Sequence, residues 1–299
     1  MKTENKILWV ECGGSQTQGI FIQTYKTIKK FQISRPFHAI HSDLLELKDL
    51  TDELKKRIND ACPHQILFFA AGIQESQKEY WKKILKSYWL HTPLIYAGSD
   101  LEALGMAFQR PAILAILGTG SSAAVWNGKN ISEKTPSLGW ILGDEGSGAW
   151  IGKQLLKYWL HGSMPEELKV SFHGFLSNSE PESIISGIYG REGKKYSASL
   201  ALWLRENEVR RHVWIREFLQ NGWNEFWTLN LKPLYQKSSS CPIVLCGGIA
   251  WNFRDQLNDF FSSKNIENLC FTPSATYVLE DKIKRYGPES SYFPVLENI

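Results

Sequence analysis

Strand-like and helix-like segments follow one another along the chain in an order that occurs twice. Near the amino terminus, short runs at 7–10, 19–23 and 29–33 are separated by turns at 13–14 and 25–26, which predicts an antiparallel meander. The next segments alternate between helical and strand patterning, with helices expected at 42–58, 77–89 and 101–108 and buried strands at 65–70 and 94–97. At 112–117 and 123–126 the strand pattern returns and a hairpin turn follows, which indicates two related halves.

The second half differs from the first by a long, mainly helical stretch at about 150–236. We expect its helices at 150–161, 165–175, 182–188, 198–206 and 215–231, then a buried strand at 242–245, a helix near 252–261 and a loosely held tail at 286–299. The pattern predicts an α/β protein with lobes at 1–111 and 112–299, the helical stretch being an insertion in the second lobe. In such folds the ligand lies at the carboxyl ends of the strands, which here means a cleft between the lobes.

The composition of the chain excludes several classes of protein. With 43% hydrophobic and 22% charged residues among 299, the chain has enough apolar residues for a globular core. A net charge of +3 without a block of Lys or Arg gives nucleic-acid binding no electrostatic support. The five cysteines are odd in number and lack metal-ligand spacing, and no apolar run approaches the length of a signal peptide core or a membrane span. We therefore expect a cytoplasmic protein without a membrane or nucleic-acid partner.

Two glycine-rich turns each follow a strand-like run. The first is Gly13-Gly14-Ser15-Gln16-Thr17, and the second is Gly118-Thr119-Gly120-Ser121-Ser122. Glycine allows backbone N–H groups to approach an anion closely, and Ser and Thr add hydroxyl donors. Two such turns that face each other could hold a polyphosphate, so phosphoryl transfer is the leading hypothesis.

Three carboxylates are candidates for the chemistry. Asp100 follows a strand, and an ionised Asp near an alcohol can accept its proton. Glu11 ends the first strand, where it could hold Mg²⁺ through water. Asp144, between two glycines, is the third. Two of these sites also have a structural interpretation, because Ser99 or Asp100 could cap a helix, and Asp144 and Glu145 could lie in a solvated loop or in the first turn of the helix near Trp150. The flanking glycines favour function for Asp144, whereas Glu145 suits a structural role.

The ordered set of motifs carries a resemblance. The two turns, the segment Gly139–Gly148 (GWILGDEGSG) and Cys246-Gly247-Gly248-Ile249-Ala250 resemble the N-acetylglucosamine kinase branch of the actin-like ATPase superfamily from about residue 7 to 275. The wider group includes ATPases that activate 2-hydroxyacyl-CoA dehydratases and benzoyl-CoA reductases. The resemblance implies two ribonuclease H-like lobes with ATP between them, Mg²⁺ on its phosphates and an amino sugar beside the γ-phosphate. It also implies a homodimer, for which the sequence shows no self-complementary surface.

The resemblance further implies roles for individual residues. Those that would contact the nucleotide phosphates are Gly13, Gly14, Ser15 and Thr17 in the first turn and Gly118, Thr119, Gly120 and Ser121 in the second. Gly247 and Gly248 would let the adenosine lie against the backbone, and Asp100 matches the catalytic base. Asp144 matches the carboxylate that holds sugar hydroxyls, together with the backbone of Ser137, Leu138 and Gly139.

The sequence departs from its relatives at three positions. Gln16 stands where they have Lys or Arg, so a cation near the phosphates is missing, and Ser15 replaces a Thr. Arg35 occupies the place of an Asn that touches the sugar. It could pair with a substrate carboxylate, which would make N-acetylmuramic acid a candidate. Alternatively, it could pair with Asp100 or Glu11 and block the pocket.

Three functions remain open on these grounds. The first is an ATP-dependent kinase for the 6-hydroxyl of N-acetylglucosamine or a related amino sugar. The second is a non-catalytic sugar sensor, which the residues at Gln16 and Arg35 would suit. The third is an ATPase activator of a radical dehydratase, which needs cysteines near the lobe junction to hold an iron–sulfur cluster. The absence of cysteine between Cys62 and Cys241 argues against the third.

Overall fold

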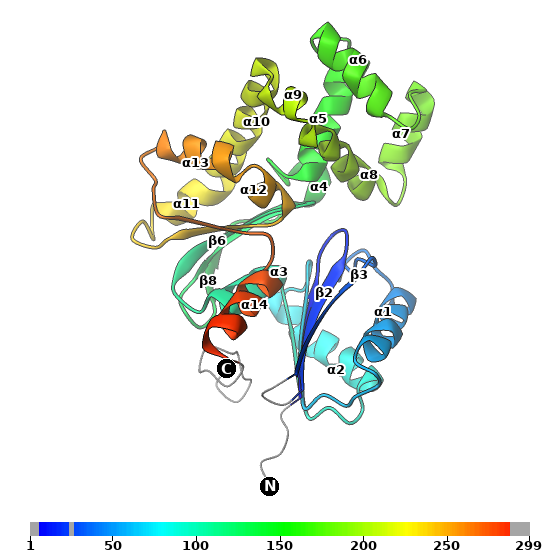
Figure 1. Cartoon of the computed structure of the whole chain (residues 1–299), viewed down its shortest axis with the longest axis vertical. Coiled ribbons are helices and arrows are strands. Elements are labelled where there is room, and N and C mark those ends of the chain that lie inside the picture. The colour runs from blue at the N-terminus through cyan, green and yellow to red at the C-terminus, as the bar shows by residue number, and fades with distance from the viewer. Residues whose placement is uncertain (1–5, 24–26, 288–299) are drawn as a thin grey trace. The chain divides into compact units, whose positions relative to one another are not determined.

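The computed structural model describes residues 6–23 and 27–287, and these form two compact units (Figure 1). The described residues of the first unit lie within 6–112, 126–132 and 272–287, and those of the second within 113–125 and 133–271. The turn expected at 25–26 and the tail expected beyond 287 lie outside the described residues. The compact units divide the chain differently from the expected lobes, 1–111 and 112–299. The lobe boundaries stay a prediction.

The first unit contains a five-stranded sheet in the order β3-β2-β1-β4-β5. Its strands are β1 (Ile7–Cys12), β2 (Thr17–Gln23), β3 (Thr27–Ile33), β4 (Gln65–Ala70) and β5 (Leu94–Gly98). β1 to β3 are antiparallel neighbours, whereas β4 runs parallel to β1 and β5 runs parallel to β4. The predicted meander is confirmed, and the carboxyl ends of β1, β4 and β5 lie at one edge of the sheet.

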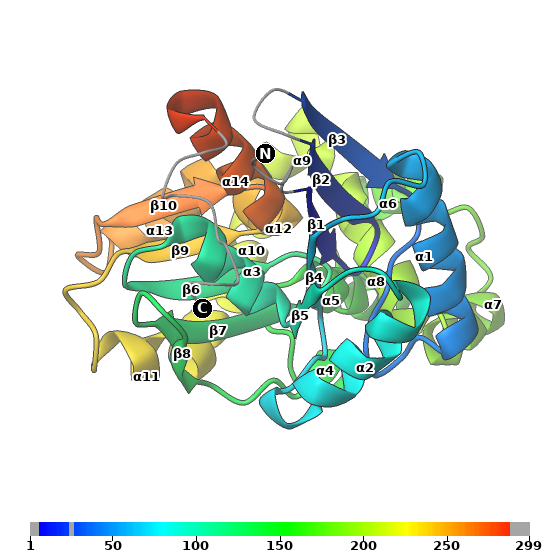
Figure 2. The same cartoon turned by 90° about the horizontal axis from the view of Figure 1, so that it is seen from below.

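Helices cover both faces of this sheet (Figure 2). They are α1 (Leu44–Arg57), the short 3₁₀ helix η2 (Glu75–Gln77), α2 (Lys78–Tyr88), α3 (Asp100–Phe108) and α14 (Ala275–Tyr286). Because side chains alternate along a strand, Leu8 and Val10 of β1 join the core under α1 and α2, while Trp9 faces α14. Glu11, two positions after Trp9, faces the same way.

Helix α14 was not predicted. Hydrogen bonds made by residues at its start connect it to Trp9 and Glu11 of β1. Glu11 Oε2 accepts hydrogen bonds from Thr276 N and Thr276 Oγ1 at 2.7 and 2.6 Å, and Glu11 Oε1 accepts one from Ala275 N at 3.3 Å. Trp9 Nε1 donates to Thr276 Oγ1 at 3.2 Å, and Ser274 caps the helix. A carboxylate thus satisfies backbone N–H groups that a helix start leaves without partners.

The second sheet repeats the arrangement of the first. Its strands are β6 (Ala112–Leu117), β7 (Ser121–Trp126), β8 (Ile131–Lys134), β9 (Ile243–Cys246) and β10 (Leu269–Thr272), in the order β10-β9-β6-β7-β8. In each sheet the first strand lies in the middle, with the second and third strands on one side and the last two on the other. The predicted α/β class with two related halves is confirmed.

The stretch expected to be mainly helical is helical. It comprises α4 (Gly139–Leu142), α5 (Gly148–Leu160), α6 (Glu166–Phe175), α7 (Pro181–Tyr189), α8 (Gly193–Leu200), η3 (Ala201–Arg205), α9 (Asn207–Arg211), α10 (Val213–Phe226), the π-helix η4 (Trp227–Leu231) and α11 (Lys232–Tyr235). After β9 come α12 (Gly248–Asn252) and α13 (Arg254–Ser262). One hydrophobic core joins β6, β7 and β9 to α5, α10 and α13. Helix α4 and strand β10 were not among the predicted elements.

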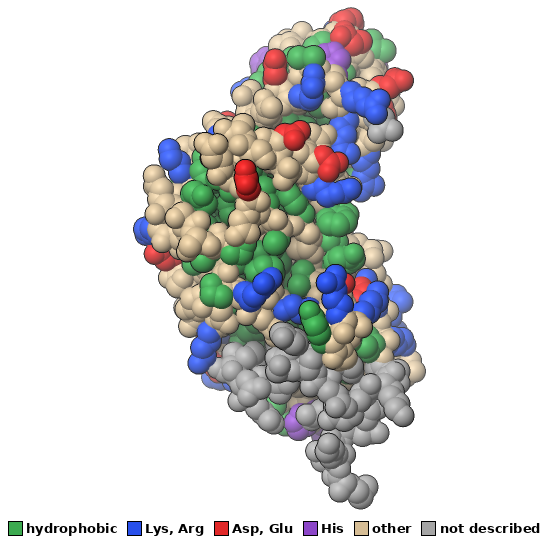
Figure 3. Space-filling view, turned by 60° about the vertical axis from the view of Figure 1, so that its left-hand side comes forward, with side chains coloured by type: hydrophobic (Ala, Val, Ile, Leu, Met, Phe, Trp, Pro, Cys, Tyr) green, Lys and Arg blue, Asp and Glu red, His purple; other side chains and the backbone are tan. Residues whose placement is uncertain are grey.

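The surface carries charges of both signs. On the face drawn in Figure 3, Lys and Arg side chains form several separate groups with Asp and Glu side chains among them. Among the described residues, every helix is too short or too polar to cross a membrane.

We predict that Glu11→Ala destabilises the first unit, because Ala275 and Thr276 N–H groups lose their acceptor inside the protein. Urea unfolding followed by circular dichroism is expected to show a loss of about 1–3 kcal/mol. Glu79→Ala on the exposed face of α2 is the matched control and should change stability by about 0.5 kcal/mol or less. Equal stability of Glu11→Ala and wild type would contradict this account of α14.

Candidate functional site

The second glycine turn lies between β6 and β7. Hydrogen bonds within the turn and from the start of α5 fix its backbone. Gly118 N donates to Gly120 O at 2.9 Å, which closes the turn. Gly148 N, at the start of α5, donates to Gly118 O at 2.8 Å, and Ala149 N donates to Thr119 O at 3.1 Å. The first N–H groups of a helix are therefore used to fix the carbonyls of this turn.

The turn at Gly247 and Gly248 lies directly against the second glycine turn. β6 and β9 are parallel neighbours, with Ile116 paired to Cys246, so both chains leave the sheet at the same edge. Gly247 has φ +114°, and a Cβ there would lie 2.6 Å from Leu117 O. A side chain at Gly247 would therefore push the two turns apart. The structure brings together these two predicted parts of the nucleotide site.

Asp144 holds the second glycine turn through its side chain. Its carboxylate is almost fully buried, and Oδ1 accepts a hydrogen bond from Ser121 N at 3.2 Å. Oδ2 lies 2.8 Å from Lys194 Nζ on α8. Asp144 has φ +57° and precedes α5, whose N-cap is Ser147, so it is not part of the helix that the structural interpretation assumed.

The neighbouring residues of the same segment have separate roles. Glu145 Oε2 accepts a hydrogen bond from Asn230 Nδ2 on the π-helix η4 at 3.2 Å, which agrees with its expected structural role. Ser137, Leu138 and Gly139 lie exposed at the start of α4, and Gly139 has φ +73°. Their expected contact with a sugar stays a prediction.

The first glycine turn connects β1 and β2. Gly13 N donates to Gln16 O at 2.9 Å, and Gly14 and Ser15 are exposed. Thr17 is fully buried, and its hydroxyl donates to Arg35 O at 2.7 Å. This hydrogen bond connects the end of the turn to the chain that follows β3. Gln16 Oε1 accepts a hydrogen bond from Gln32, so these two side chains form an amide pair at the position where the resemblance implies a cation.

Asp100 is the first residue of α3, directly after β5. Ser99 is the N-cap, its hydroxyl accepts from Glu102 N, and Glu102 Oε2 accepts from Ser99 N at 2.9 Å, which makes a capping box. Asp100 Oδ1 accepts from Leu101 N at 2.9 Å. The helix start therefore fixes the backbone that carries Asp100.

Glu102 is itself held by a network that sequence reasoning missed. Its Oε1 accepts from Lys78 Nζ at 2.5 Å and from Tyr96 Oη at 2.6 Å. Burial acts to raise the pKa of Glu102, but the hydrogen bonds from Lys78, Ser99 N–H and Tyr96 together hold that pKa below its usual value. The Ser99-x-x-Glu102 spacing was the signal for the cap, whereas nothing in the sequence pointed to Lys78.

Glu11 lies near enough to Asp100 for their charges to interact. Burial raises the pKa of Glu11, the hydrogen bonds from α14 oppose this effect, and the charge of Asp100 raises the pKa further. Three of the four acceptor positions on the Glu11 carboxylate are occupied by α14, so one is left for a metal-bound water. Within 6–23 and 27–287, no three His, Cys, Asp or Glu side chains are grouped to hold a metal ion.

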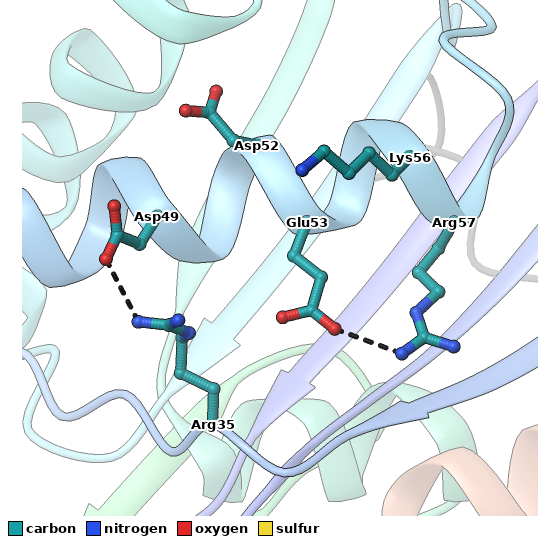
Figure 4. Close-up of a pocket in the computed structure, with 6 residues that line it drawn as sticks. All are labelled: Arg35, Asp49, Asp52, Glu53, Lys56 and Arg57. Carbon is teal, nitrogen blue, oxygen red and sulfur yellow. Dashed lines mark hydrogen bonds and ion pairs between the residues drawn. The ribbon is translucent and has the colours of Figure 1, made fainter.

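Arg35 follows β3, and its side chain lies beside α1 (Figure 4). Its Nη1 donates to Asp49 Oδ2 at 3.1 Å in a pocket that is also lined by Asp52, Glu53, Lys56 and Arg57 (Figure 4). The structure thus pairs Arg35 with Asp49. Among the described residues it does not pair with Asp100 or Glu11, as the alternative interpretation expected. Because both side chains are largely exposed, this ion pair contributes little stability and can be exchanged for another.

Comparison with solved structures gives the fold. No family model matches the chain, and no curated protein matches it. A putative N-acetylglucosamine kinase from Porphyromonas gingivalis is similar with a TM-score of 0.83 and 23% identity, over 94% of this chain and 99% of that one. One from Chromobacterium violaceum has a TM-score of 0.68 and 18% identity, over 93% and 98%. A ROK family glucokinase from Streptomyces griseus, solved with glucose and AMPPNP, has a TM-score of 0.53 and 13% identity, over 92% and 96%.

The chain has the actin-like ATPase fold.

The resemblance that the motifs indicated is confirmed at the level of the fold, with two ribonuclease H-like sheets. At these identities the similarity carries no residue roles. Within this actin-like ATPase fold, the structure brings Gly118–Ser121 together with Gly247, Gly248 and Asp144, and it places Asp100 near Glu11. It also adds Lys194, which no sequence motif indicated.

We predict that Glu102 makes stability depend on pH in the acid range. Because its folded-state pKa lies below the unfolded value of 4.5, the unfolded chain binds the proton more readily and stability falls as pH drops below that value. Urea titrations between about pH 7 and pH 3.5 should show a shallower loss for Glu102→Gln than for wild type, together with lower stability at pH 7. Parallel curves of stability against pH for the two proteins would show that Glu102 does not cause the pH dependence.

Proposed function

We propose that this protein is an ATP-dependent kinase that phosphorylates the 6-hydroxyl of an amino sugar. The observation that carries the proposal is the close packing of the second glycine turn against Gly247 and Gly248 at the ends of β6 and β9. This packing leaves a glycine-lined edge where a nucleotide could contact backbone without meeting side chains. The fold shared with sugar kinases supports the same assignment.

In the proposed reaction, the phosphates bind the backbone of the two glycine turns and the adenosine lies along Gly247 and Gly248. Asp100 would accept the proton of the sugar hydroxyl as that oxygen bonds to the γ-phosphorus, while the bond from that phosphorus to the bridging oxygen breaks and ADP leaves. This role suits a carboxylate at the start of a rigid helix, because phosphoryl transfer depends mainly on positioning and charge neutralisation. Ser99 and Glu102 act through Asp100, since they fix the start of α3.

Mg²⁺ would neutralise charge on the transferred phosphate. Such an ion keeps several waters and takes few protein ligands, so the carboxylate of Glu11 would hold it through water. Glu11 has one acceptor position left for this role, because α14 already uses most of its oxygen positions.

On the sugar side, Asp144 would accept hydrogen bonds from hydroxyls, supported by the backbone of Ser137, Leu138 and Gly139. Arg35 would pair with a substrate carboxylate by exchanging Asp49 for it, which favours N-acetylmuramic acid among the amino sugars. A sugar sensor that binds but does not phosphorylate is the alternative, and the amide pair at Gln16 is the observation that favours it.

The first experiment is a coupled ADP-release assay with Mg-ATP and, in turn, N-acetylglucosamine, N-acetylmuramic acid, glucosamine and glucose. Sugar-dependent ADP release is expected for at least one amino sugar. Asp100→Asn should lower kcat by a factor of at least about 100 while nucleotide binding stays close to wild type. Sugar binding by calorimetry without any ADP release would instead identify a sensor.

Arg35 is tested by its effect on substrate preference. We predict that Arg35→Asn shifts relative kcat/KM from N-acetylmuramic acid toward N-acetylglucosamine by about tenfold or more, because a charge-assisted contact is lost. Arg57→Asn is the matched control, since Arg57 lines the same pocket and pairs with Glu53. Equal preference in wild type and Arg35→Asn would exclude Arg35 as the selectivity residue.

A further inference from the structure

Lys194 lies against the second glycine turn from a distant part of the sequence. It is the second residue of α8, and its Nζ lies 2.8 Å from Asp144 Oδ2. A Cβ built on Gly120 would lie 2.8 Å from Lys194 Nζ and 2.8 Å from Asp144 Oδ2. Glycine at position 120 is therefore what lets the ammonium and the carboxylate approach the turn.

The groups around Asp144 are of the kinds that bind phosphate oxygens in proteins. Its carboxylate receives the N–H of Ser121 on one oxygen and the ammonium of Lys194 on the other. The hydroxyl of Ser121 is buried without a hydrogen-bond partner among the described residues, so a third donor is in place. A backbone N–H, a hydroxyl and a Lys ammonium together form an anion site, and Asp144 occupies part of it.

The contact between Lys194 and Asp144 is one that an incoming anion can replace. It is an ion pair of 2.8 Å between Lys194 Nζ and Asp144 Oδ2, and this oxygen has no other partner among the described residues. The Lys194 side chain is 26% exposed, so solvent and ligands reach it, whereas that of Asp144 is 6% exposed. A flexible four-carbon stem lets the ammonium turn without movement of the backbone.

We propose that Lys194 is the phosphate-binding cation of the second glycine turn, and that the nucleotide takes it from Asp144. Asp144, released from the ammonium, becomes free to accept hydrogen bonds from the sugar. The exchange would make nucleotide binding strengthen sugar binding, and it rests on the proposed kinase function.

The proposal predicts opposite effects for the two partners. Asp144→Asn keeps an oxygen for Ser121 N–H but removes the charge that competes for Lys194, so Mg-AMPPNP should bind several-fold more tightly. Lys194→Met should bind it at least about tenfold more weakly, and Lys194→Arg should restore most of the affinity. A residue that only supported the fold would give losses in both cases.

Calorimetric titration with Mg-AMPPNP is the test, with thermal melting to show that each variant is folded. Lys194→Met leaves a buried carboxylate unpaired, so the deciding comparison is Asp144→Asn against Asp144→Asn with Lys194→Met. The double variant should lose the gain and bind at least about tenfold more weakly than Asp144→Asn. Lys195→Met, at a neighbouring exposed lysine paired with Glu192, should equal wild type.

The outcomes separate this inference from the proposed function. Equal Mg-AMPPNP affinity of Asp144→Asn and the double variant, with wild type binding normally, would overturn the role of Lys194 and leave the kinase intact. Failure of wild type to bind Mg-AMPPNP would overturn the proposed function and this site with it.

Discussion

The close contact between the ends of β6 and β9 is the constraint on which the second unit depends. Parallel pairing brings both strands to the same edge of the sheet, and the glycine at 247 lets the two turns touch. A side chain there would meet Leu117 O at 2.6 Å, which is backbone and cannot move aside cheaply. The predicted phosphate turn and the predicted adenosine turn are therefore one continuous surface of backbone within this unit.

Each unit contains a carboxylate, half-buried in the first unit and buried in the second, that accepts hydrogen bonds from backbone N–H groups. In the first unit Glu11 binds the start of α14, and in the second Asp144 binds the N–H of Ser121. Both carboxylates satisfy backbone donors that would otherwise be buried without partners. They differ in their neighbours, because Glu11 faces the charge of Asp100 whereas Asp144 faces the ammonium of Lys194. Only the second arrangement includes a cation that, in our proposal, an anionic ligand takes over.

Much of the fold could be predicted because its signals are local, as in the continuous apolar run that forms the strand at 65–70. Helix α14 was missed because its start is fixed by Glu11, which lies 265 positions away along the chain. The candidate site shows the same difference between local signals and contacts between residues that are far apart in the sequence. Asp100 and Asp144 stand in motifs that can be recognised from neighbouring residues, whereas Lys194 reaches the second glycine turn only through the fold, from a helix without a motif of its own. Sequence can locate a glycine turn, but not the cation that a distant helix brings to it.

A crystal structure with Mg-AMPPNP bound tests the central claim most directly. The account predicts phosphate oxygens within hydrogen-bond distance of the backbone N–H groups of Gly118–Ser121, with the adenosine along Gly247 and Gly248. A nucleotide bound elsewhere on the chain, with this glycine edge empty, would contradict it.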